Sequence, residues 1–99
     1  MRFHKGSFPI ETVNPKKKII VVTGWIDEDN VYGFYKYGKV WKATDLMSGT
    51  LIVTEVTRKA CVEWIERNFD KIDEKKNTFE YREMIESFRI ALKEELNDR

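Results

Sequence analysis

The chain has 99 residues, of which 41% are hydrophobic and 35% charged. This length and balance predict one globular domain and argue against a two-domain enzyme, a disordered chain or a membrane-spanning one. Lys and Arg number 18 and Asp and Glu 17, so the formal net charge of +1 does not steer the whole molecule onto a polyanion.

Catalytic and metal-binding signatures are missing from the sequence. It has one cysteine, Cys61, and one histidine, His4, and no glycine-rich phosphate loop. A lone cysteine forms neither an internal disulfide nor a zinc cluster, which predicts a reducing, cytoplasmic compartment. We therefore expect no enzyme activity, no cofactor and no metal, and no membrane segment, because the longest aliphatic run is only 19–22.

Residues 1–18 are predicted to form a basic arm. They contain Gly6, Pro9 and Pro15 and end in a run of three lysines, 16–18. Such a stretch favours an irregular segment with at most one short strand, around 8–12. The remaining residues, 19–99, are predicted to form a single domain.

β-branched and aromatic residues dominate from 19 to 56 and are interrupted by turn residues at 27–30, 37–38 and 48–49. The pattern predicts four antiparallel strands at 19–26, 31–37, 40–46 and 51–56. Beyond 56 the spacing becomes helical, which predicts helices at about 58–70 and 78–96. The first of these has one broad apolar face, which consists of Cys61, Val62, Trp64, Ile65, Phe69 and Ile72. Thr57 is the expected N-cap of the first helix, and Asn77 with Glu80 forms the expected capping box of the second.

The predicted fold is therefore α+β, an antiparallel meander of three to four strands followed by two C-terminal helices packed on one sheet face. In the first helix the stretch 70–76 is almost wholly charged, so we expect the helix to end or fray there. The second helix carries one apolar stripe, which consists of Tyr81, Met84, Ile85, Phe88, Leu92 and Leu96.

Alternation along simple hairpins assigns the strand residues to two faces of the sheet. The first face is aromatic and is expected beneath the helices; its members are Ile19, Val21, Thr23, Trp25, Tyr32, Phe34, Trp41, Ala43, Ile52, Thr54 and Val56. The second is also largely apolar; its members are Ile20, Val22, Gly24, Ile26, Val31, Gly33, Tyr35, Tyr37, Val40, Lys42, Thr44, Leu46, Leu51, Val53 and Glu55.

An apolar second face needs a cover, because the outer face of a half-buried sheet is normally polar. Gly24 and Gly33 are expected opposite each other there, a pairing that indicates a bulge or a close approach of another backbone. Tyr35, Tyr37 and Lys42 surround them. Two covers remain open: the chain's own arm, through apolar side chains at 3, 8 and 10, or a partner protein.

The sequence thus favours a small non-enzymatic protein-interaction module that docks another protein, or a second copy of itself, on the second sheet face or the C-terminal helix. Phe79 and Ile90 lie off the main helix stripe and are the expected contacts in a dimer. The alternative is a nucleic-acid-binding accessory domain that uses Lys36, Lys39 and Lys42 together with the sheet aromatics.

Overall fold

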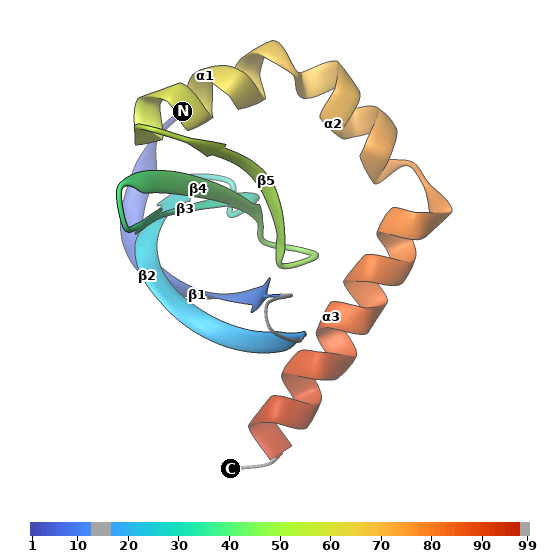
Figure 1. Cartoon of the computed structure of the whole chain (residues 1–99). Helices are drawn as coiled ribbons and strands as arrows, with labels where there is room; N and C mark the ends of the chain where they lie inside the picture. The colour runs from blue at the N-terminus through green and yellow to red at the C-terminus, as the bar shows by residue number, and fades with distance from the viewer. Residues whose placement is uncertain (13–16, 98–99) are drawn as a thin grey trace.

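The computed structural model describes residues 1–12 and 17–97 and shows an α+β fold (Figure 1). One antiparallel sheet has the strand order β1-β2-β3-β4-β5. Its strands are β1 (Phe3–Thr12), β2 (Lys18–Asp27), β3 (Tyr32–Tyr37), β4 (Val40–Asp45) and β5 (Thr50–Glu55), and the helices are α1 (Arg58–Arg67), α2 (Phe69–Lys76) and α3 (Phe79–Asn97). The predicted count of three to four strands and two helices is therefore too low by at least one strand and by one helix.

The additional strand is β1, which occupies most of the predicted arm and pairs with β2 over ten residue pairs. The arm forms a strand despite its proline because Pro9 lies on the outer edge of the sheet, where the missing N–H breaks no ladder bond. The N–H of Glu11, two residues later, points to the same outer side and donates to the carbonyl of Gly49 at 2.9 Å. This bond brings the end of β1 to the β4–β5 turn and curls the meander into a partly closed barrel.

β2 bends away from β3 at Gly24. Only Trp25 and Ile26 of β2 pair with β3, opposite Phe34 and Gly33. The expected pairing of Gly24 with Gly33 is therefore wrong, and the residue opposite Gly24 is Gly6 on β1. The physical reason is the curvature of β2. At the bend Gly24 passes so close to the backbone of Phe34 that a side chain at this position has no room.

The main core lies where the first sheet face meets α1. Phe34 and Ala43 from the sheet pack with Cys61 and Ile65 from the helix, and all four are fully buried. Helical spacing puts Cys61 and Ile65 on one face of α1, as the sequence indicates. Phe3 also joins this core, with its ring edge-on to Phe34 at a centroid distance of 5.4 Å.

A β-bulge between Ala43 and Thr44 changes the predicted face of β5. Beyond the bulge Val53 stands opposite Ala43, and Glu55 stands opposite Trp41. Directly opposed residues share a face, so Val53 and Glu55 lie on the first face, whereas Thr54, opposite Lys42, lies on the second. The predicted faces of all three residues are therefore wrong. One inserted residue reverses the alternation along the rest of the strand.

The helices begin and end at polar caps. Thr57 accepts a hydrogen bond from the N–H of Ala60 at 3.0 Å, which confirms it as the N-cap of α1. α3 is capped instead by Thr78, which accepts from the N–H of Tyr81 at 3.2 Å. Asn77 was expected in that role but is the C-cap of α2, with its side chain bonded to the carbonyl of Asp73.

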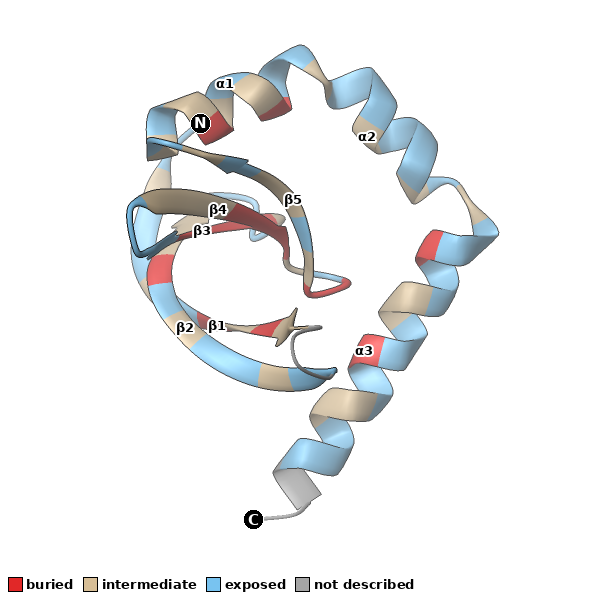
Figure 2. Ribbon diagram, in the orientation of Figure 1, coloured by how far each residue is buried: buried red, intermediate tan, exposed pale blue. Residues whose placement is uncertain are grey.

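The charged stretch expected to end or fray the first helix forms α2. Glu and Lys are good helix formers, and the half-buried Ile72 packs against the main core. Figure 2 shows that α2 is mostly exposed, whereas buried residues gather on β3, β4 and the β4–β5 turn. Within the described residues no helix combines the length and apolar character that a membrane crossing requires.

α3 packs on the β4–β5 turn and also contacts β2, rather than lying beside α1 on the first sheet face. Its Phe88 is 2% exposed and covers Gly49, which has a φ of 71° and leaves space for the ring. The prediction that both helices pack on one sheet face is therefore wrong for α3. Lys16 of the basic run and the side chain of Leu96 in the helix stripe lie outside the described residues.

Candidate binding surface

The second sheet face is covered in part by β1. Phe8 and Ile10, each 3% exposed, pack with Tyr35 in a second core cluster. The Phe8 ring lies 2.6 to 2.9 Å from the position that a Cβ on Gly33 would occupy, so Gly33 makes room for the ring. Of the two covers that the sequence left open, the arm closes this part of the face.

The predicted interaction residues therefore separate into three groups. Gly24, Gly33 and Tyr35 are buried inside the chain. Tyr37 and Lys42 stand at the border of the covered region, with Tyr37 64% exposed. The last two, Phe79 and Ile90, are 70% and 50% exposed on α3, away from the other five.

A hollow of about 820 Å³ remains on the second face beside the covered region. It lies where β2 diverges from β3. Its lining comes from all five strands and consists of Ile10, Glu11, Thr12, Lys18, Ile20, Val22, Thr23, Tyr35, Lys36, Tyr37, Lys42 and Leu51. Half of these side chains are apolar or aromatic, and those of Tyr37 and Leu51 are more than half exposed.

The charge at the hollow is positive. Lys18, Lys36 and Lys42 line it against one acid, Glu11, whose carboxylate is 3.7 Å from the ammonium of Lys17. The ammonium of Lys42 also lies 4.4 Å from the centre of the Tyr37 ring, a cation–π contact. The hollow therefore suits a ligand that is both apolar and acidic.

A buried polar cluster around Asp45 lies elsewhere, between the β4–β5 turn and the helices. One carboxylate oxygen, Oδ2, accepts from the hydroxyls of Tyr81 and Ser48, each at 2.7 Å, and from the N–H of Ser48 at 3.2 Å. The other oxygen, Oδ1, is buried without a hydrogen bond and is 3.8 Å from the ammonium of Lys76. Asp45 thereby joins β4, the end of α2 and the start of α3.

Two tyrosines, Tyr81 in this cluster and Tyr32 beside its Lys76, are held in their neutral form. Burial raises the pKa of Tyr81, and the hydrogen bond to Asp45 and the charge of Asp45 raise it further. Burial also raises the pKa of Tyr32, to which the nearby carboxylates of Asp45, Asp27 and Asp73 add. An adjoining cavity of about 170 Å³ separates β5 from the helices and is walled by Trp64 and Ile72 among others.

Cys61 is predicted to be unreactive in the folded protein. Its thiol is fully buried and donates to the carbonyl of Trp41 at 3.5 Å, and burial raises its pKa. A thiolate is the reactive species, so a disulfide reagent such as DTNB should titrate Cys61 only when the chain unfolds. Fast modification of the native protein at neutral pH would contradict this.

The sequence did not reveal two features: the unpaired part of the β2 edge and the Asp45 cluster. Pro9 identifies β1 as an edge strand, because a proline inside a strand marks an outer edge, but it carries no signal for the unpaired part of β2. The Asp45 cluster gave no local signal, since Asp45 and Tyr81 are 36 positions apart.

Among residues 1–12 and 17–97, no three His, Cys, Asp or Glu side chains meet in a group that fits a metal ion. Comparison of the chain with protein-family models, with curated proteins and with solved structures found no match. The site therefore has to be interpreted from its own geometry.

Proposed function

We propose that this protein is a small non-enzymatic protein-interaction module and that its docking surface is the hollow beside Tyr37 and Lys42. The observation that carries the proposal is the exposure of apolar side chains in a concave region. The neighbouring part of the same face is closed by Phe8 and Ile10, whereas this part has no cover among the described residues. A concave apolar surface with a charged rim is typical of a recognition site.

The non-enzymatic part of the proposal is supported by the structural use of the buried polar groups around Asp45. The hydroxyls of Ser48 and Tyr81 both bond to Asp45, and this cluster connects a strand turn to two helices. Such a role is structural. We place the protein in a reducing, cytoplasmic compartment because its single cysteine, Cys61, is a buried free thiol.

Self-association through α3 is supported less well than docking at the hollow. Phe79 and Ile90 lie eleven residues apart on the same side of the helix, about 16 Å along its axis at the usual rise per residue. The helix places Glu83 and Glu86 between them on that side, so the two apolar side chains do not form one continuous patch.

The test is selection of binding peptides by the full chain from a phage-displayed library of random segments about twelve residues long. We expect selected peptides whose binding weakens at least about tenfold in a Tyr37→Ala variant, because an interface aromatic commonly contributes 2 kcal/mol or so. Tyr35→Ala is unsuitable, since Tyr35 belongs to a core cluster. Binding is measured by fluorescence anisotropy.

Ile90→Glu is the matched control, because it changes an exposed apolar residue outside the hollow. It should leave peptide affinity unchanged. A library that yields no binder, or binders that Ile90→Glu disrupts and Tyr37→Ala does not, would refute docking at the hollow. Sedimentation of the same two variants tests self-association, which Ile90→Glu should weaken if α3 forms a dimer.

The contact of Lys42 with Tyr37 supports a second candidate, single-stranded nucleic acid. Tyr37 is exposed enough to stack on a base, and Lys36 and Lys39 are exposed nearby. Titration with oligo(dT) at two salt concentrations separates the candidates. Tight binding that falls steeply with salt and with neutralisation of the three lysines would favour nucleic acid.

A further inference from the structure

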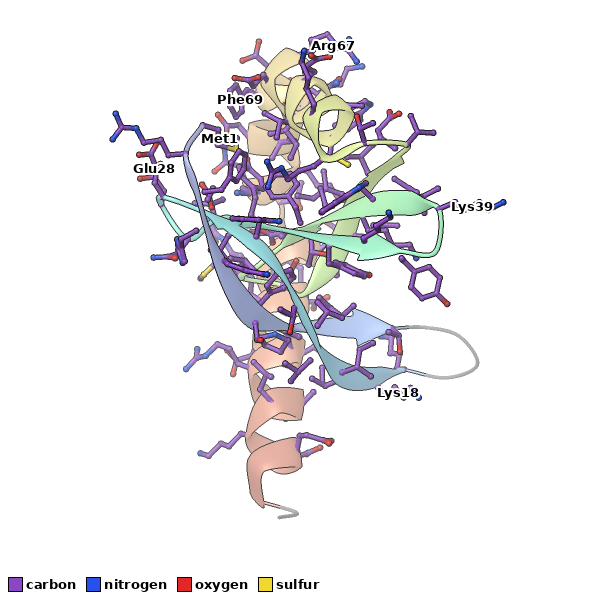
Figure 3. All side chains as sticks on the ribbon, turned by 90° about the vertical axis from the view of Figure 1, so that its left-hand side faces the viewer. Met1, Lys18, Glu28, Lys39, Arg67 and Phe69 are labelled. Atoms are coloured by element: carbon purple, nitrogen blue, oxygen red, sulfur yellow. The ribbon has the colours of Figure 1, made fainter. Side chains whose placement is uncertain are left out.

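Among the described residues, one edge of β2 has no hydrogen-bonded strand partner over most of its length. β2 pairs with β1 from Lys18 to Asp27, but its ladder with β3 holds only the pairs of Trp25 and Ile26. Figure 3 shows the two hairpins diverging on the same side of the molecule, one ending at Lys18 and the other near Lys39. The described residues provide no ladder partner for the β3-facing edge of 18–23, and we call this edge with its hollow the open seam.

The hydrogen bond of Glu11 shows which backbone groups face the open seam. Because the Glu11 N–H donates to Gly49, away from β2, Glu11 and its partner Ile19 form a non-hydrogen-bonded pair. Hydrogen-bonded and non-hydrogen-bonded pairs alternate along an antiparallel ladder. The pair of Pro9 and Val21, two positions further along, is therefore also non-hydrogen-bonded. Both residues of a non-hydrogen-bonded pair direct their N–H and C=O groups outward. Ile19 and Val21 therefore present donors and acceptors to the open seam.

We propose that the open seam receives an extended acidic segment of a partner protein as an added β-strand. This inference rests on the proposed function and names the partner's chemistry. The backbone of Ile19 and Val21 supplies the hydrogen bonds, and the apolar side chains of Ile20 and Val22 supply contacts along the hollow. Lys18, Lys36 and Lys42 favour acidic side chains on that segment.

The alternation of donors and acceptors distinguishes a peptide from other occupants. A peptide backbone carries both N–H and C=O groups and can pair with every outward group of Ile19 and Val21. A phosphate backbone carries only acceptors and would leave the carbonyls of β2 unpaired. A second copy of this chain would bring the same lysines together in the seam, at a cost in like-charge repulsion.

The test uses the tightest peptide from the library selection and two versions of it, each N-methylated at alternate residues. In an added strand every second N–H bonds to β2, so one version should lose at least about tenfold in affinity and the other no more than about threefold. Equal affinities of the two versions, or equal losses, would overturn strand addition. The selected sequences should also alternate apolar and acidic residues, and basic or helix-patterned sequences would overturn the assignment of an acidic strand.

A protein variant provides an independent measurement. Val21→Pro removes an N–H that faces the seam but breaks no bond to β1, whereas Val21→Ala keeps that N–H and trims the same side chain. Peptide affinity should fall at least about tenfold with proline and about twofold with alanine. Equal effects of the two substitutions on well-folded protein would contradict the pairing. A peptide whose binding depends on Tyr37 but is unaffected by N-methylation would refute strand addition alone. Failure to select any peptide would refute the proposed function itself.

Discussion

Replacing Gly24 with alanine should unfold the protein or cost more than about 3 kcal/mol of unfolding free energy. A Cβ at this position would collide with the carbonyl oxygen of Phe34 and would also contact the backbone of Tyr35. Backbone atoms of a paired strand cannot rotate away, so the sheet would have to shift where β2 bends. Urea denaturation followed by circular dichroism measures the loss.

Gly6→Ala is the matched control, because Gly6 faces Gly24 across the same ladder. There a Cβ would meet only the side chain of Ile26, with Cδ1 at 3.0 Å, and this end of a flexible side chain can move. The expected change is within about 1 kcal/mol, since alanine also restricts the unfolded chain. Similar losses in the two variants would show that β2 does not bend around Gly24.

Asp45→Ala should destabilise the protein by about 3 to 5 kcal/mol, the usual cost of removing one partner from a buried charged cluster. The substitution leaves the hydroxyls of Ser48 and Tyr81 without their acceptor and removes the partner of Lys76. A loss of this size is a large fraction of the total stability of a small domain. Tyr81→Phe removes only one donor and should cost about 1 to 3 kcal/mol.

The dependence of stability on alkaline pH provides a second test of the Asp45 cluster. In the folded chain the pKa of Tyr81 is raised above the ordinary 10.0. The neutral Tyr81 hydroxyl therefore stabilises the fold fully below pH 10, and this stabilisation is lost as the pH rises through the raised pKa. The unfolding free energy should thus decline above pH 10, and less steeply in Tyr81→Phe. Equal declines, or a small effect of Asp45→Ala at neutral pH, would contradict the role assigned to the cluster.

Some of the fold follows from local pattern. Alternation in the strands identified Trp25, Phe34 and Ala43 as core residues, and helical spacing identified Cys61 and Ile65 as the side of α1 that meets them. The N-cap at Thr57 was also predictable. These features depend on neighbours a few residues apart along the chain, where side-chain direction repeats with the period of the element.

The predictions that failed depend on contacts between distant residues. The bulge after Ala43 moved Val53 to the other face, and no residue type near it announces an inserted position. The expected partner of Gly24 was wrong because turn positions alone do not set the register of a strand that bends. The hollow results from that bend. Alternation along the strands suggested Tyr37 and Lys42 as surface residues, but it could not predict the shape of the hollow beside them.

The sequence by itself determined that the sheet has two apolar faces, because alternation records the character of each side of a strand. Only the tertiary structure decided how the second face is used. Phe8 and Ile10 cover one part of it, and the divergence of β2 from β3 leaves the other part open. The physical reason is that polarity belongs to individual residues, whereas curvature arises from close backbone approaches between segments that the sequence keeps apart.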